Sequence, residues 1–255
     1  MAMKPLDPAT PAPSASRRLP YVLLGVFAVV FAVAAIHPVD RKDWMLENTL
    51  TVLFLAILLL TRKRFPLSNV SYTLILVFVC LHTLGAHYTY SLVPYDRWSQ
   101  SLFGKGLNEM LGFQRNQFDR LVHFCFGLLL AYPIREVFLR IAGVRGFWGY
   151  YLPLDVTMSF SMLYELIEWA YAAIAGGDAG AAFLGTQGDE WDAQKDMAMA
   201  TLGGLISMCV VALVNWKLDR NFGAEIADSL RVIDGDRPLG EFRLAEIRNR
   251  NSGQV

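Results

Sequence analysis

Acidic residues and a histidine occur inside otherwise apolar stretches of this sequence, at spacings that place them on common helix faces. Asp119 and His123 are four residues apart, and Glu165 and Glu168 are three apart, so each pair lies on one side of a helix. Asp196 lies inside a further apolar stretch. A charged side chain costs about 2.5–3.5 kcal/mol at the centre of a bilayer, so these groups must face a protein interior or water.

We predict that these five residues form one catalytic site. Glu168, Asp196 and His123 would act as acid–base groups or as metal ligands, and Asp119 would orient His123. Oxygen ligands fit Mg²⁺ or Ca²⁺, and imidazole admits Zn²⁺ or Mn²⁺, so a divalent metal ion is a candidate cofactor. An acid–base pair or a proton relay fits the same residues without any metal. Candidate binding residues at the mouth of the site are Glu47, His87, Tyr88, Arg115, Asn116, Gln187, Asp189 and Asp192.

Structural roles explain part of this pattern equally well. Asp189 and Asp192 follow the sequence Gly-Thr-Gln-Gly at 185–188, so they can cap a helix, and Asp119 can cap another. Asp119 can also form an ion pair with Arg115 or Arg120. His82 has the surroundings of a core histidine. Capping does not explain the groups inside their helices, which are His123, Glu165, Glu168 and Asp196.

Six apolar stretches must position these residues. Each is close to the 18–20 residues that cross a bilayer core about 30 Å thick. Lipid cannot satisfy exposed backbone polar groups, so each stretch must be a helix. We therefore predict an all-α, polytopic transmembrane bundle of six helices. The stretches are 19–36, 44–60, 71–86, 119–139, one between 148 and 175, and one between 189 and 216.

The composition supports a membrane protein and excludes other classes. The chain has 255 residues, of which 54% are hydrophobic and only 18% charged, and its mean hydropathy is +0.34. The 23 basic and 23 acidic residues cancel, so nucleic acid is not an expected partner. Cys80, Cys125 and Cys209 fall in apolar runs and have no metal or disulfide spacing. No phosphate loop, nucleophile elbow or dinucleotide fingerprint occurs.

The distribution of Lys and Arg predicts the topology. Basic residues gather before the first helix, after the second, between the fourth and fifth, and after the sixth, which makes that side and both termini cytoplasmic. The acids of the helices then lie toward the periplasm. We expect a disordered tail at 1–18, a transmembrane domain at 19–216, and a polar cytoplasmic tail at 217–255 with one helix near 242–250.

Two further segments have distinctive sequences. The aromatic loop 87–117 is expected to lie on the membrane surface. Ser16, Arg17 and Arg18, followed by a moderate apolar run, also fit a cleavable export signal, and its removal would leave five helices.

Several of these motifs resemble those of the YjdF-type bacterial inner-membrane proteins, a family with a domain of unknown function. The resemblance covers residues from about 20 to 216 and implies a polytopic membrane protein, but it brings no established activity. The matching motifs are His-Pro-Val-Asp-Arg-Lys-Asp-Trp at 37–44, Leu-Glu-Asn at 46–48, His-Tyr-Thr-Tyr at 87–90, the stretch 115–124, Tyr-Glu-Leu-Ile-Glu-Trp at 164–169, and the stretch 185–196.

A weaker resemblance is to the VanZ-like family, which is linked to glycopeptide tolerance. That family's Asp-Lys-x-x-His-Phe element is similar to residues 119–124, and two further elements are similar to 165–168 and 196–203. Glu168 stands where that family usually has Gln, and Ala200 where it has Asn. These differences change charge and metal-binding capacity, so they put any shared reaction in doubt.

Three functions fit these observations for a multi-pass protein of the bacterial inner membrane. The first is an envelope enzyme, with or without a metal, that acts on a membrane lipid, a lipid-linked compound or a periplasmic small molecule. The second is a small proton-coupled transporter, for which Pro133 and Pro153 offer hinges. The third is a non-catalytic envelope partner that binds through the aromatic loop. The sequence leaves the oligomeric state open.

Overall fold

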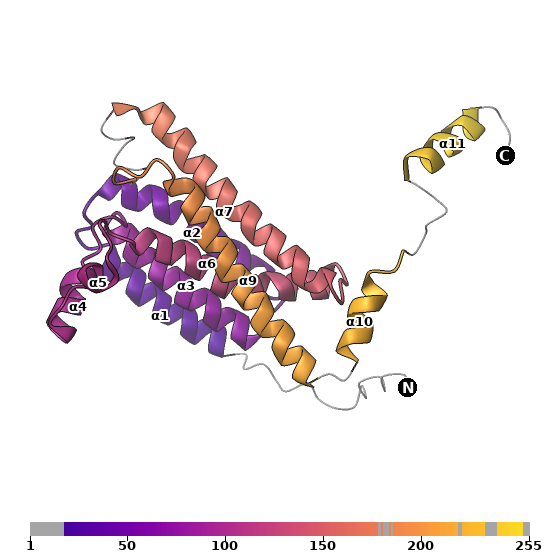
Figure 1. Ribbon diagram of the computed structural model, residues 1–255, viewed down its shortest axis with the longest axis horizontal. Coiled ribbons are helices and arrows are strands. Elements are labelled where there is room, and N and C mark those ends of the chain that lie inside the picture. The colour runs from indigo at the N-terminus through magenta and orange to yellow at the C-terminus, as the bar shows by residue number, and fades with distance from the viewer. Residues whose placement is uncertain are drawn as a thin grey trace.

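The computed structural model describes residues 18–177, 180, 184, 186–218, 221–232 and 239–251. Residues 1–17 of the predicted tail and Gly185 of the predicted capping sequence lie outside this part of the chain. Within the described residues the chain forms helices and no strand, which confirms the all-helical prediction. Figure 1 shows the long helices side by side in one bundle.

Six long helices match the six predicted stretches closely. They are α1 (Leu19–Ala34), α2 (Arg41–Thr61), α3 (Asn69–His87), α6 (Phe118–Ile141), α7 (Trp148–Ala175) and α9 (Asp192–Leu218). Four shorter helices are also described: α4 (Tyr95–Phe103), α5 (Leu107–Leu111), α10 (Phe222–Ser229) and α11 (Leu239–Asn251). Thus α4 and α5 form within the aromatic loop, and α11 covers the range expected for a helix in the C-terminal tail.

Four of these helices are long and apolar enough to cross a membrane by themselves: α2, α3, α6 and α9. The apolar helix α1 has 16 residues and is shorter. Helix α7 has 28 residues, but its acids lower its hydropathy. The structure therefore bears out an all-helical membrane protein. The crossing of α1 and α7 stays a prediction.

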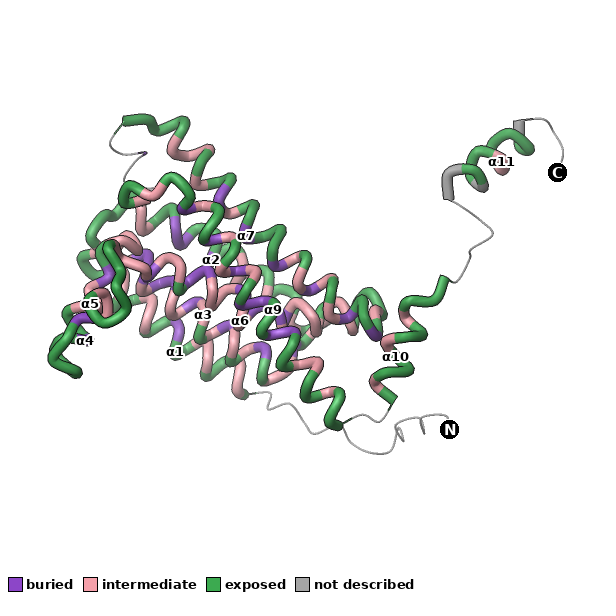
Figure 2. The backbone as a smooth tube through the Cα atoms, in the orientation of Figure 1, coloured by how far each residue is buried: buried purple, intermediate pink, exposed green. Residues whose placement is uncertain are grey.

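Burial in the bundle is reversed relative to a water-soluble protein. Large apolar side chains on the long helices are exposed, including Leu60, Ile174 and Leu218 at 80% or more. Polar side chains such as Thr83 and Thr157 are completely buried. In Figure 2 the buried residues follow the inner faces of the helices. This pattern is expected when lipid surrounds the bundle and polar groups must find partners inside it.

Helices α6 and α9 make the most extensive contact in the bundle. Glycines allow their backbones to touch. A Cβ atom at Gly127 would lie 1.9 Å from the Ala200 carbonyl oxygen, and one at Gly203 would lie 2.1 Å from the Phe124 carbonyl oxygen. Small residues serve this purpose at many membrane helix interfaces. The contact holds the first turns of α6 and α9, which carry site residues, at a fixed separation.

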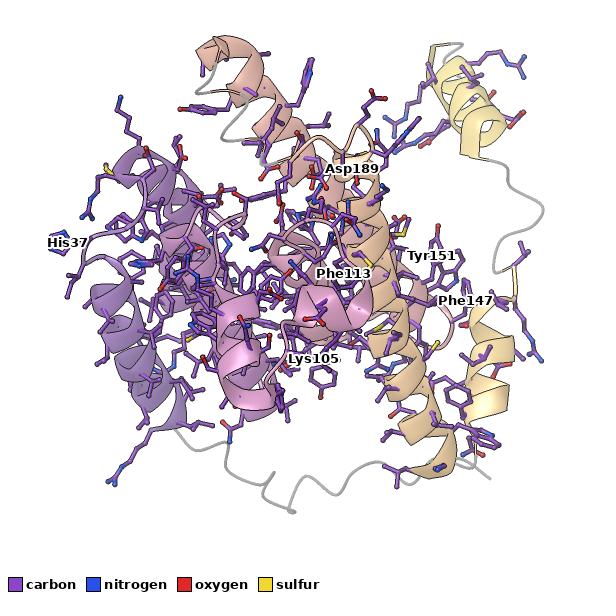
Figure 3. The ribbon with its side chains drawn as sticks, turned by 60° about the vertical axis from the view of Figure 1, so that its left-hand side comes forward. His37, Lys105, Phe113, Phe147, Tyr151 and Asp189 are labelled. Carbon is purple, nitrogen blue, oxygen red and sulfur yellow. The ribbon has the colours of Figure 1, made fainter. Side chains whose placement is uncertain are left out.

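The remaining helices pack around this pair. Helix α6 also contacts α3 and α7, α7 contacts α9, and α1 packs on α3. Phe27, Ile75, Val79 and Leu130 form an apolar cluster between α1, α3 and α6. Helix α10 lies against the turn before α7, where the Ser229 hydroxyl accepts a hydrogen bond from the Phe147 amide. Figure 3 shows Phe147 and Tyr151 beside this helix, whereas Asp189 lies where α9 begins.

Substitution at the α6–α9 contact should destabilise the protein. Gly203→Ala places a methyl group against the α6 backbone, which cannot move as a flexible side chain can, so we expect a loss of about 1–3 kcal/mol of unfolding free energy. Unfolding of the purified protein in detergent, titrated with a denaturing detergent, measures it. The control is Gly25→Ala in α1, which has nothing within 4 Å of the new methyl group. Equal stability of the two variants would contradict the proposed contact.

Candidate functional site

His123 lies at the centre of the predicted site. Its ring is buried on α6, with Nε2 3.2 Å from Glu165 Oε1 and 3.8 Å from Asp119 Oδ1. Nδ1 faces the Ser161 hydroxyl at 3.4 Å. Two carboxylates face Nε2, which favours a proton on this nitrogen, and Nδ1 can then accept a hydrogen bond from the Ser161 hydroxyl. The i, i+4 spacing of Asp119 and His123 thus produces the contact that the sequence predicts.

Two carboxylate oxygens in this region lack hydrogen bonds. Asp196 is 2% exposed and Glu165 is 8% exposed. Neither Asp196 Oδ1 nor Glu165 Oε1 has a hydrogen-bond partner within the described part of the chain, although His123 Nε2 lies 3.2 Å from Glu165 Oε1. Arg120 Nε is also without a hydrogen-bond partner and lies 4.0 Å from Asp196 Oδ1. Buried polar atoms of this kind are costly, and they are typical of functional sites.

A second group of polar side chains extends the site toward α2 and α3. The Tyr164 hydroxyl donates a short hydrogen bond to the buried Glu47 carboxylate. His82 Nε2 lies 3.1 Å from the Glu47 carbonyl oxygen, so it donates there, and His82 Nδ1 accepts from the Tyr90 hydroxyl at 2.5 Å. The Tyr90 ring covers Gly85, where a Cβ atom would lie 2.6 Å from it. Sequence reasoning missed Tyr90 and Tyr164, and it assigned His82 to the core.

The mouth of the site is an ion-pair network. Arg115 reaches Asp192 at 2.7 Å and Asp189 at 3.8 Å, and Arg120 reaches Asp192 at 3.0 Å. Arg120 and Lys195 both contact the Asp189 carboxylate, Lys195 at 2.6 Å. Lys195, the Trp191 amide and Arg120 hold the pKa of Asp189 well below its ordinary value. The network joins the start of α6 to the start of α9.

The loops beside this network are tied together by amides. The backbone N–H of Asn116 donates to Gln187 Oε1 at 3.0 Å, and Gln187 Nε2 donates to the backbone carbonyl oxygen of Asn116 at 3.2 Å. Asn116 Nδ2 also donates to the Val93 carbonyl oxygen, and Arg115 donates to the Thr186 carbonyl oxygen. These predicted binding residues therefore hold the loops before α6 and α9 in place.

The five predicted catalytic residues come together from three helices. Glu168 lies close enough to Asp119, Glu165 and Asp196 to interact with each electrostatically. In the described part of the chain, however, no three side chains of His, Cys, Asp or Glu converge on one point in a way that would hold a metal ion. The predicted metal set of His123, Glu168 and Asp196 thus has no geometric support here.

Three structural interpretations can be compared with the coordinates. Asp119 is not the helix cap, because α6 begins one residue earlier and Asn116 Oδ1 accepts from the Phe118 amide. Asp189 accepts the Trp191 amide just before α9, as a capping residue does. Arg115 and Arg120 contact Asp189 and Asp192, and no ion pair of either with Asp119 is found among the described residues.

His87 and Tyr88 lie to one side of the carboxylate cluster. His87 Nδ1 lies 2.8 Å from the Ala34 carbonyl oxygen, and the His87 carbonyl oxygen accepts from the Val39 amide. Tyr88 packs edge-on against His87 and Trp98. His87 therefore connects the end of α3 to the end of α1 and the α1–α2 connection, and Tyr88 packs the end of α3 against α4. These contacts support a structural role.

Taken together, the fold and the site define a helical membrane protein with a buried cluster of carboxylates around one histidine. Residues 19–217 match the family described as "Predicted membrane protein (DUF2238)". The chain is 39% identical over 185 residues to the inner membrane protein YjdF of Escherichia coli K12, which covers 72% of this chain and 84% of that protein. The protein belongs to this family. No solved structure matches it.

The predicted family and the predicted location as a multi-pass protein of the bacterial inner membrane are thus confirmed. The weaker resemblance to the VanZ-like family stays a prediction.

Removal of Asp192 should be costly, because its side chain is 5% exposed and neutralises both Arg115 and Arg120. Asp192→Ala leaves these buried cations underpaired, and we expect a loss of about 3–5 kcal/mol in unfolding free energy. The control is Asp228→Ala, which removes an exposed ion pair with Arg231 and should change stability by less than about 0.5 kcal/mol. Denaturing-detergent titration distinguishes the two. Similar losses would rule out a structural role for the network.

Asp189 should make stability dependent on pH at acid values. Its pKa is lowered in the folded protein from an ordinary value of 3.8, so its ion pairs stabilise the fold fully above about pH 4. The stabilisation is lost as pH falls through the lowered pKa. The stability difference between the wild type and Asp189→Asn should therefore be constant from pH 7 to 4 and shrink below pH 4. Unfolding measured across this range checks it, and a constant difference at all pH values would refute it.

Proposed function

We propose that the protein is an enzyme of the cell envelope in which His123 and Glu165 perform acid–base chemistry on a membrane lipid or a lipid-linked headgroup. One observation carries the proposal. Nε2 of a buried histidine faces two carboxylates at 3.2 and 3.8 Å, and among the described residues a third carboxylate, Asp196, has an oxygen without a hydrogen-bond partner. Side chains in this arrangement can transfer protons without first breaking strong hydrogen bonds to other residues.

The roles of the residues follow from their contacts. Asp119 and Glu165 face Nε2 and would stabilise the imidazolium that forms when Nδ1 takes up a proton, so His123 can hold the proton that a leaving oxygen needs. Glu165 Oε1 is available to accept a proton from an attacking water or hydroxyl group. Asp119 is a positioning residue, since it lies one helical turn before His123 and contacts the same nitrogen.

The proposed topology places this site beneath the periplasmic surface. All six long helices cross the membrane, residues 1–18 and 217–255 lie in the cytoplasm, and 19–216 form the membrane domain. Helix α7 supports this because its 28 residues reach about 42 Å, more than a bilayer core. The basic residues at the opposite end of the bundle support the orientation. They are Arg62, Lys63, Arg64, Arg140 and Arg145.

A proton-coupled carrier is the second candidate, and a hydrogen-bonded series favours it. The Tyr90 hydroxyl forms a hydrogen bond with His82, and His82 forms one with the backbone carbonyl oxygen of Glu47. The Tyr164 hydroxyl donates a hydrogen bond to the Glu47 carboxylate. Proton flux into liposomes that contain the purified protein, abolished in Glu47→Gln, would support this function.

A non-catalytic partner that binds through the loop 87–117 would instead lose function on deletion of that loop and keep it in all site variants.

The enzyme proposal predicts a change in envelope lipids. In a bacterium that lacks its own family member, expression of the chain should consume one lipid or lipid-linked species, measured by mass spectrometry of membrane extracts. His123→Ala and Glu165→Gln should slow this turnover by at least about 100-fold, since proton transfer by one group contributes about 10²–10⁴-fold.

The matched control is Asp155→Asn, which removes an exposed acid from α7 and should leave turnover unchanged. Equal lipid profiles with the wild type and the His123 variant, at equal protein levels, would overturn the enzyme.

A further inference from the structure

We propose that the carboxylates of the site bind an ammonium group, carried by the zwitterionic headgroup of an amine-bearing lipid such as an ethanolamine phospholipid. These carboxylates are called the recess below, and they belong to Glu47, Asp119, Glu165, Glu168 and Asp196. This inference rests on the proposed function, for which it names the substrate class. It arises from the distribution of charge in the site, from unpartnered atoms in the recess, and from the cations at its mouth.

Charge in the site is unevenly compensated. Arg115, Arg120 and Lys195 all gather on Asp189 and Asp192 at the mouth. Asp196 has one arginine nitrogen at the outer limit of 4.0 Å. In the described part of the chain no Lys or Arg forms an ion pair with the other carboxylates of the recess, which are Glu47, Asp119, Glu165 and Glu168. Glu47 and Glu165 are buried, and Asp119 and Glu168 are half-buried. Carboxylates in such surroundings are costly without a cation, and a bound cation would relieve that cost.

Specific atoms are available to a ligand. Glu165 Oε1 and Asp196 Oδ1 are buried acceptors without hydrogen bonds, on α7 and α9, and both carboxylates interact electrostatically with Asp119 on α6. An ammonium group has three N–H donors that point in different directions. It can therefore donate to carboxylates on three helices, which a group with a single N–H or O–H donor cannot do.

The form of the cluster favours an ammonium group over a metal ion. A metal ion needs three or more ligand atoms around one point at about 2.0–2.6 Å, and the described side chains do not provide such a point. An ammonium group makes longer contacts of about 2.7–3.2 Å, so it tolerates a more open arrangement. The carboxylates come from four helices, α2, α6, α7 and α9.

The mouth offers the complementary charge. Lys195 is the most exposed cation of the network, with 48% of its side chain accessible, and it lies beside Arg120. Arg120 connects the two regions, because it contacts Asp189 at the mouth and lies 4.0 Å from Asp196 in the recess. A phosphate next to the ammonium group would meet Lys195 and Arg120 while the ammonium group enters the recess. A zwitterionic headgroup fits both charges, whereas an anionic headgroup would place no cation against Glu165 and Asp196.

Lipid binding to the purified full-length chain in detergent tests this inference, with native mass spectrometry as the readout. Phosphatidylethanolamine, phosphatidylglycerol and phosphatidylcholine with the same acyl chains are the probes. We expect phosphatidylethanolamine to bind at least tenfold more tightly than either of the others. The anionic headgroup of phosphatidylglycerol carries no ammonium group, and the ammonium group of phosphatidylcholine has no N–H donor. Asp196→Asn and Glu165→Gln should each reduce this preference at least tenfold. Asp155→Asn, with the same loss of charge on an exposed surface, should retain it.

Equal binding of the three lipids to the wild type overturns the proposal and requires no variant to fold. A preference that survives both recess substitutions overturns it as well. Soluble ethanolamine phosphate serves as a further arm: binding as tight as that of the lipid assigns the ammonium group to a soluble compound. Loss of lipid turnover in His123→Ala without any ethanolamine preference would refute only the ammonium site. An ethanolamine preference with unchanged turnover would refute only the enzyme.

Discussion

The cost of charge in a medium of low dielectric governs this structure. Carboxylates that enter the apolar bundle must be paired, protonated or ligated, because lipid offers them nothing. The bundle satisfies this requirement only in part. It concentrates three cations on Asp189 and Asp192 at the start of α9 and leaves the deeper acids with a histidine and tyrosine hydroxyls. The glycine contact between α6 and α9 is what brings Arg120 and His123 to these acids, since bulkier residues would push the two helices apart.

The two regions have different tasks as a result. The mouth is a closed network in which each acid has several hydrogen-bond donors. The loops beside it are held by two reciprocal hydrogen bonds between Asn116 and Gln187. The recess contains polar atoms without partners, and these are expensive unless something else uses them. A rigid mouth above an unsatisfied recess is the arrangement expected of a site in which positioning is provided by the fold and binding is left for a ligand.

The sequence predicts the helices well because the bilayer imposes length and polarity on each of them. The ranges of the six long helices agree with their apolar stretches to within a few residues. The spacing of Asp119 and His123 also predicts a shared face, since helix geometry alone sets it. Contacts between distant segments have no such rule. That Tyr164 bonds to Glu47, or Tyr90 to His82, depends on how α7, α3 and α2 pack, and no local signal in the sequence encodes it.

The same reasoning explains where residue types mislead. A tyrosine in a membrane helix is usually an interfacial or packing residue, so Tyr164 resembles many others until its hydroxyl is seen on a buried carboxylate. Likewise, a set of Glu, Asp and His suggests a metal ion, because the sequence gives the donors without their separations. In the part of the chain that the structure describes, the acids come from several helices and form no group that would hold a metal ion. An ammonium group makes longer, hydrogen-bonded contacts than a metal ion does, so it tolerates carboxylates that are spaced more widely, and this difference in contact length separates the two interpretations.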